Sequence, residues 1–135
     1  MDMDDVKTLM KKAGIGYLAT TDGGRARVRP MGAFLWAGDE LWMASDRRTD
    51  KCADISQCAE VEICFLVDGW KHVRISGSVA VSENRSDKAA LLDAVPGLAQ
   101  YMQGPDNPEY VVLRLKPRHI RVLGEGAMAY EEIVP

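Results

Sequence analysis

Apolar residues near the N-terminus recur with the spacing of a helix. Four of them fall at i, i+3, i+4 and i+7 and share one helix face: Val6, Leu9, Met10 and Ala13. Aspartates precede this face and lysines follow it, which is the order that the helix dipole favours. The pattern predicts an amphipathic helix that ends at Gly14, a typical helix stop.

Most of the remaining chain alternates between apolar and polar residues, as half-buried strands do. In the longest such segment, valine and isoleucine side chains share one face, and His72 and Arg74 lie on the other. Asp-Gly turns at Asp22 and Asp68 join neighbouring segments and are strong hairpin signals. Strands are expected at Gly16–Thr21, Arg25–Met31, Leu41–Ser45, Glu60–Val67, Lys71–Val81, Tyr110–Lys116 and His119–Leu123, with a break at Pro117.

Three short helices are expected between the strands. They cover Thr49–Gln57, Ser86–Val95 with Ser86 as its cap, and Pro96–Gln103. Six or seven hairpin-connected strands with short helices between them predict a mainly β (α+β) fold, a small antiparallel barrel. The length indicates a single domain over residues 1–135, whose last residues, Ala127–Pro135, are expected to pack on a partner or to fray.

Composition narrows the function classes. The chain has 47% hydrophobic and 27% charged residues, as a soluble globular protein does, and its net charge of −3 gives no basic excess for nucleic acid. Apolar runs such as Ile63–Val67 are far shorter than the roughly 20 residues of a membrane span. The acidic start at Met1–Asp5 does not resemble a secretory signal, so we expect a cytoplasmic protein without membrane or nucleic-acid partners.

Common catalytic and metal-binding motifs are missing from the sequence. Cys52, Cys58 and Cys64 lie six residues apart and form no close pair, so we expect reduced thiols and no metal site. There is no G-x-S-x-G, H-E-x-x-H, P-loop or dinucleotide fingerprint. The catalytic residues stay unassigned.

Two groups of cations are candidates for binding. Arg25, Arg27 and Arg29 alternate with Ala26, Val28 and Pro30, so they project from one face of a strand. A solvated face paired with nearby carboxylates is the interpretation that this stripe alone favours.

The segment from Ser45 to Lys51 is more specific, because it leaves a strand and enters a helix. It combines the hydroxyls of Ser45 and Thr49, cations and free helix N–H groups, which are the elements of a phosphate site. The alternative is a plain helix start, with Thr49 as the cap and Lys51 solvated. The sequence leaves both open.

Three stretches, in this order and spacing, resemble the pyridoxamine 5′-phosphate oxidase-like, FMN-binding split-barrel family, in its short single-domain members. They are Gly16–Met31, Leu41–Ser45 with Thr49 and Lys51, and His72–Val79. The resemblance covers roughly residues 5 to 124. It implies a six- to seven-stranded antiparallel split β-barrel with short flanking helices.

The resemblance also implies a cofactor site for FMN. The strand with Arg27, Arg29, Pro30 and Met31 would run along the isoalloxazine ring and the ribityl chain. Ser45, Thr49 and Lys51 would bind the phosphate, and His72 would lie near the ring. The family forms homodimers with two flavins at the subunit interface, so each site would draw on both chains.

The implied activity is that of an oxidoreductase on a small-molecule substrate. True oxidases of vitamin B6 carry an arginine where this chain has Asp50, and a longer C-terminal part that holds their substrate. We therefore expect a different substrate. The alternatives are the same fold with a deazaflavin coenzyme or haem, reduction of nitroimidazole drugs, or a stress-associated protein that holds flavin without turnover.

Overall fold

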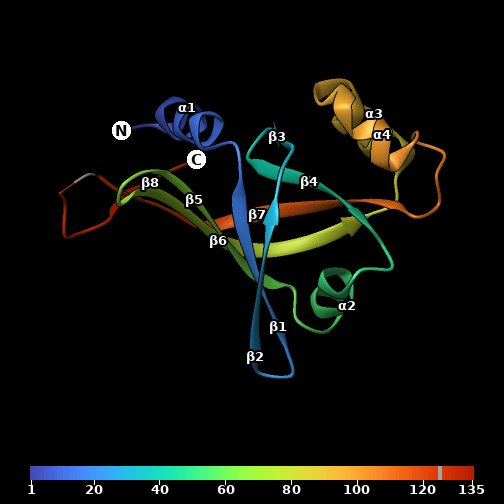
Figure 1. The fold of residues 1–135 in the computed structure, drawn as a ribbon, viewed down its shortest axis with the longest axis horizontal. Coiled ribbons are helices and arrows are strands. Elements are labelled where there is room, and N and C mark those ends of the chain that lie inside the picture. Colours follow the sequence, from blue (N-terminus) through green and yellow to red (C-terminus); the bar gives the residue numbers. More distant parts are fainter. Residues whose placement is uncertain (125) are drawn as a thin grey trace.

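Eight antiparallel strands form one curved sheet in the computed structural model (Figure 1), which describes residues 1–124 and 126–135. The strands are β1 (Gly16–Asp22), β2 (Arg25–Met31), β3 (Phe34–Ala37), β4 (Glu40–Asp46), β5 (Glu60–Asp68), β6 (Lys71–Ser82), β7 (Tyr110–Leu123) and β8 (Glu131–Ile133). Their order in the sheet is β2-β1-β5-β6-β7-β4-β3, with β8 paired to β7. This arrangement confirms the α+β split barrel.

Four helices flank the sheet: α1 (Met3–Ala13), α2 (Asp50–Gln57), α3 (Arg85–Ala94) and, after a 3₁₀ turn at Pro96–Leu98, α4 (Ala99–Met102). The predicted first helix is confirmed, with a capping box between Asp2 and Asp5 and Gly14 at φ 76° as its C-cap. The cap of α3 is Asn84 rather than the expected Ser86. The Asn84 side-chain oxygen accepts the Ser86 amide N–H at 3.0 Å, because Ser86 already lies in the first turn.

Two hydrophobic clusters stabilise the fold. The larger fills the barrel with side chains such as Leu18, Phe65 and Ile75, and α1 covers it with its apolar face. The smaller lies between the sheet and α3 and contains Trp42, Leu91, Tyr110 and Val112. Burial raises the pKa of Tyr110 to about 12, and its hydroxyl donates to the Lys88 carbonyl at 2.9 Å.

The expected break at Pro117 is wrong, since β7 runs through this residue. The register shifts between Ser76 and Gly77, so that Arg118 is an extra residue on β7 and forms a β-bulge. A Cβ atom on Gly77 would lie 2.0 Å from the Lys116 carbonyl oxygen, so only glycine permits this close approach. A bulge thus accommodates a proline that a regular ladder would exclude.

The C-terminal residues do not fray. β8 pairs with β7, and Ile133 is only 3% exposed in the barrel core. The amino group of Met1 lies 3.4 Å from the Glu131 carboxylate, and Figure 1 shows the two termini close together. Within the described residues, none of the helices has the length and apolar character that crossing a bilayer requires.

Strands β2 and β3 are the two edges of the sheet, and residues 32 and 33 connect them. The order does not close between these edges, which leaves the barrel open there. The outer backbone groups of β2 therefore have no partner strand among the described residues. An unpaired edge can bind a ligand or a second chain through its main chain.

Candidate phosphate and flavin site

The N-terminal amide groups of α2 receive no hydrogen bond from the side chain of the N-cap residue. Thr49 is the N-cap residue, but its hydroxyl donates to the Asp46 carbonyl at 2.8 Å and makes no cap hydrogen bond. The Ser45 hydroxyl lies 3.2 Å from that of Thr49. The first amide N–H groups of α2 therefore receive no side-chain acceptor from Thr49, which differs from the plain capping alternative.

Lys51 follows in the first turn of α2 and is half-buried rather than solvated. Its ammonium group makes no ion pair or hydrogen bond with the described residues. The neighbouring arginines differ, because each of them has a carboxylate partner: Arg27, Arg29, Arg47 and Arg48. Burial lowers the pKa of Lys51, and the positive charge of Arg29 acts in the same direction. A partly desolvated cation beside another cation is suited to an anion.

Arg29 lies next to Lys51 and is held by a buried carboxylate. Its guanidinium donates to the Thr20 hydroxyl at 2.7 Å and lies 3.5 Å from Asp54. The Thr20 hydroxyl donates to the same Asp54 oxygen at 2.7 Å, and Asp54 is only 6% exposed. Sequence reasoning missed Thr20 and Asp54, although Asp54 follows Lys51 by three residues and so shares its helix face.

The other predicted residues of β2 are placed differently. Arg27 pairs with Asp22 at 2.5 Å and with Asp50 at 3.4 Å, as in the alternative of a face neutralised by carboxylates. Pro30 is exposed, and the Met31 side chain is part of the barrel core at 8% exposure. Among the predicted residues of β2, only Arg29 has a side chain that lies next to Lys51. A ligand along β2 would therefore meet mainly the open backbone edge of this strand.

The two arginines before α2 are exposed and bound to carboxylates. Arg47 donates to Glu109 at 2.8 Å, and Arg48 donates to Asp46 at 2.7 Å. The hydrogen bonds from the Arg48 side chain and amide lower the pKa of Asp46 to about 2. Neither arginine has the unneutralised charge that Lys51 has.

His72 lies far from Lys51 within one chain. It is the second residue of β6 and contacts the Trp70 carbonyl and, at 2.7 Å, the Tyr130 hydroxyl. The other end of β6 approaches α2, where the Val79 amide donates to the Ala59 carbonyl at 2.9 Å. Figure 1 shows α2 and β8 on opposite sides of the molecule. The structure brings together Arg29, Ser45, Thr49 and Lys51, and leaves His72 apart.

Comparison with known proteins establishes the family. The family model described as "Pyridoxamine 5'-phosphate oxidase" matches residues 3–124. The chain therefore belongs to this family. General stress protein 26 of Bacillus subtilis is 24% identical over 134 residues, 93% of this chain and 94% of that protein. A NimC/NimA family protein from Clostridium acetobutylicum superposes with a TM-score of 0.86 at 27% identity, covering 96% of this chain and 90% of that one.

The names of solved structures with this fold mention different cofactors. An FMN-binding protein from Nostoc punctiforme has a TM-score of 0.72 at 18% identity, with coverage of 98% and 96%. An F420 reductase has a TM-score of 0.67 at 20% identity and covers 84% of this chain and 94% of its own. A heme binding protein from Mycobacterium smegmatis has a TM-score of 0.75 at 19% identity, and the match covers 95% of this chain and 56% of that one. At these identities the likeness defines the fold alone.

Proposed function

We propose that this protein binds FMN and acts as a flavin-dependent oxidoreductase on a small organic substrate. The observation that carries the proposal is the group at the start of α2. It joins the Lys51 ammonium, which has no ion-pair partner among the described residues, the hydroxyls of Ser45 and Thr49, and helix amides to which Thr49 gives no side-chain cap. These donors and this charge match a phosphate monoester, which accepts several charge-assisted hydrogen bonds.

The residues present fit the phosphate of FMN. Lys51 would supply the counter-charge, Ser45 and Thr49 would donate hydroxyl hydrogen bonds, and the first amides of α2 would face the phosphate oxygens. Arg29 would add a second positive charge, reduced by its contact with Asp54. Asp50 opposes an anion, but its side chain is 85% exposed and lies near Arg27.

The ring of the cofactor would lie along the open edge of β2. The backbone groups of residues 29–31 on this edge have no partner strand in the described chain, and they could bond the polar edge of an isoalloxazine. The flavin would supply the redox chemistry by accepting and returning a hydride, and the protein would bind and orient it.

A homodimer would complete the site. Tyr17, Val28 and Leu66 share the outer face of the sheet by register and are 46%, 68% and 50% exposed. Such a contiguous apolar face is typical of an interface. His72 pairs in register with Leu66 and lies on this same face. A second copy seated here could therefore bring its own His72 toward the cofactor, which one chain alone does not do.

The phosphate contact is tested by titrating FMN and riboflavin into the protein and into Lys51→Met. FMN affinity should fall roughly ten- to a hundred-fold, the range for a hydrogen bond to a charged group. Riboflavin lacks the phosphate, so its affinity should stay unchanged. Lys116→Met, an exposed lysine on β7, is the control for net charge and should bind FMN normally. Equal losses for both ligands would contradict the proposal.

The cofactor and the assembly need a separate measurement. The absorbance spectrum of the purified protein should show the bands of oxidised flavin, and mass analysis should identify released FMN. A Soret band, or a released deazaflavin, would assign the site to haem or to the deazaflavin coenzyme instead. Light scattering should give twice the chain mass of 14.9 kDa, and a stable monomer would contradict the shared site.

A further inference from the structure

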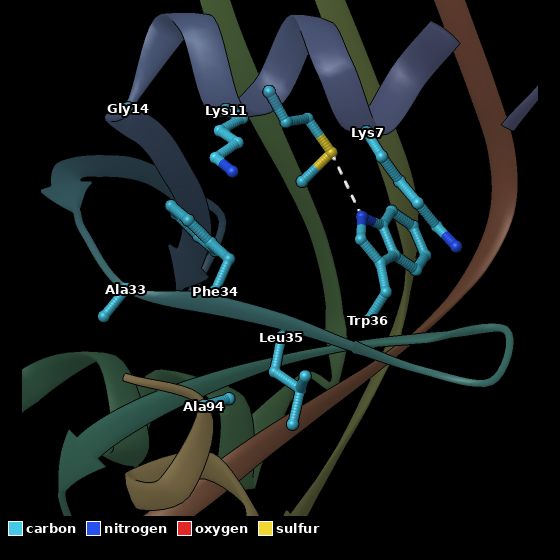
Figure 2. A pocket seen from close by; sticks show the side chains of 9 residues that line it. Lys7, Lys11, Gly14, Ala33, Phe34, Leu35, Trp36 and Ala94 are labelled. Carbon is cyan, nitrogen blue, oxygen red and sulfur yellow. Dashed lines mark hydrogen bonds between the residues drawn. The ribbon is translucent and has the colours of Figure 1, made fainter. Parts of the chain in front are cut away.

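A cavity of about 480 Å³ lies between α1 and β3, away from the group at the start of α2. Its volume falls in the range of small-molecule sites, roughly 300 to 1,000 Å³. Figure 2 shows Lys7 and Lys11 reaching from α1 into the space above β3, where Phe34 and Trp36 rise toward them. The lining residues include Lys7, Met10, Lys11, Ala33, Phe34 and Trp36.

The side of this cavity formed by β3 is aromatic and contains a weakly satisfied donor. The Trp36 indole N–H donates to the Met10 sulfur at 3.3 Å, the dashed line in Figure 2. A thioether is a weak acceptor, so this N–H can still gain by donating to an oxygen of a ligand. Phe34 and Trp36 offer aromatic surface next to it, which suits a flat apolar group.

The charges at the cavity all come from one helix face. Lys7 and Lys11 are four residues apart on α1, both are exposed, and neither makes an ion pair with the described residues. Like charges at this spacing destabilise a helix, so a bound anion would relieve their repulsion. Lys12, which does not line the cavity, instead pairs with Asp68 at 3.0 Å.

The backbone is strained where the cavity meets the sheet edges. Ala33 has a φ of 66°, a left-handed conformation that alanine rarely adopts. It follows the edge strand β2, precedes the edge strand β3 and lines the cavity. Strain of this kind concentrates at ligand sites, where the surrounding structure maintains it.

We propose that this cavity binds a small organic anion with an apolar body, of the class of aromatic monocarboxylates. The ring would pack against Phe34 and Trp36, and the carboxylate would lie between the ammonium groups of Lys7 and Lys11. The Trp36 N–H would donate to the same carboxylate. None of the residues that line this cavity belongs to the proposed flavin site, and the proposal goes beyond the proposed oxidoreductase function.

Benzoate and benzyl alcohol test the proposal, because they share a ring and differ in charge. Each is titrated into the ¹⁵N-labelled full-length protein while the Trp36 indole N–H signal, assigned with Trp36→Phe, is followed. Benzoate should shift this signal to saturation, and should bind about five-fold or more tightly than the alcohol, as expected for a pair of exposed charges.

Charge variants locate the carboxylate. Lys7→Gln combined with Lys11→Gln should weaken benzoate at least about five-fold, to the level of the alcohol, and leave alcohol binding unchanged. Both positions are exposed, so the variant should keep its melting temperature. Lys12→Gln is the matched control on the same helix and should bind benzoate as the unaltered protein does.

The proposal is overturned by a Trp36 signal that does not respond to benzoate, by equal affinities for benzoate and the alcohol, or by the same loss in Lys12→Gln as in the double variant. Lys51→Met separates this site from the flavin site and should keep full benzoate affinity. If benzoate binding is lost in Lys51→Met, the anion occupies the start of α2 and the proposal is wrong, whereas failure to bind FMN leaves the benzoate result intact.

Discussion

Two pairs of cations lie close together around the start of α2, and they differ in exposure and in their carboxylate partners. The outer pair, Arg47 and Arg48, is exposed, and each guanidinium contacts Glu109 or Asp46. The inner pair is more shielded: Arg29 shares its charge with Asp54, and Lys51 has no carboxylate partner among the described residues. One loop therefore contains cations that are already neutralised and a helix start where a cation is left without a counter-ion.

This difference indicates how a binding cation can be distinguished from a structural one. All four residues raise the local positive charge equally in the sequence, so counting charges cannot separate them. Partner carboxylates and burial do separate them, because an unpaired and partly desolvated cation gains most from an incoming anion. The predictions below test this distinction, in decreasing order of expected effect.

The largest expected effect comes from removing the carboxylate under the inner pair. Asp54→Ala leaves the Thr20 hydroxyl and the Arg29 guanidinium without their buried acceptor. The free energy of unfolding should fall by about 2–3 kcal/mol, the cost of losing hydrogen bonds to a buried charged group. Urea denaturation measures this change. Asp50→Ala, an exposed carboxylate on the same helix, should change it by less than about 0.5 kcal/mol, and equal effects would contradict the distinction.

Local patterns were sufficient to predict most of the fold. The spacing of Val6, Leu9 and Met10 predicts α1, and the Asp-Gly turns predict the hairpins, because these signals act over a few residues. The short strand β3 was absent from the expected strands, and the sheet has eight strands where six or seven were expected. The bulge opposite Gly77 and the strand β8 were not predicted either. Both depend on the neighbouring strand. At the bulge the Lys116 carbonyl lies too close to Gly77 for a side chain, and β8 forms because Ile133 pairs with the buried Ile120 of β7.

The candidate site was predictable in part. A strand that leads into a helix indicates why Ser45, Thr49 and Lys51 gather, since they are near in sequence. The pairing of Thr20 with Asp54 spans 34 residues and depends on how α2 packs on β1, which alternation does not encode. The separation of His72 from this group is likewise a property of the whole sheet.

The next effect concerns the pH dependence of FMN binding. Burial and Arg29 lower the pKa of Lys51 below its ordinary value of 10.5. Phosphate favours the charged lysine, so FMN affinity should fall as the pH rises through this lowered pKa, by about ten-fold once the charge is lost. Fluorescence titration between pH 7 and pH 10 measures it. Lys51→Met should remove this pH dependence, and a profile that persists in the variant would assign it to another group.

The sign is opposite for the stability of the protein without ligand. A lysine whose pKa is lower in the folded state binds fewer protons there than in the unfolded chain. Stability should therefore rise with pH between the lowered pKa of Lys51 and its ordinary value, while FMN affinity falls. Opposite trends of these two quantities identify Lys51 as the titrating group, since a general loss of structure would lower both.

A smaller effect is expected from the outer pair. Arg47→Gln combined with Arg48→Gln should change FMN affinity by less than about two-fold, because exposed ion pairs contribute little and these charges are already neutralised. The same fluorescence titration applies, at two salt concentrations. A loss as large as that of Lys51→Met would mean that the outer arginines bind the phosphate, and would remove the distinction between the pairs.

The smallest effect is local and concerns Asp46. Hydrogen bonds from the Arg48 side chain and amide lower the pKa of this carboxyl to about 2, so its contribution to stability is present above its ordinary value of 3.8 and is lost as the pH falls toward 2. Arg48→Gln removes the side-chain contacts and keeps the amide, so the pKa of Asp46 should rise only part of the way to 3.8. Carboxyl ¹³C titration by NMR measures this rise. If the pKa stays near 2 in Arg48→Gln, the amide and nearby lysine charge are sufficient to ionise Asp46, and Arg48 is free to contact an anion after all.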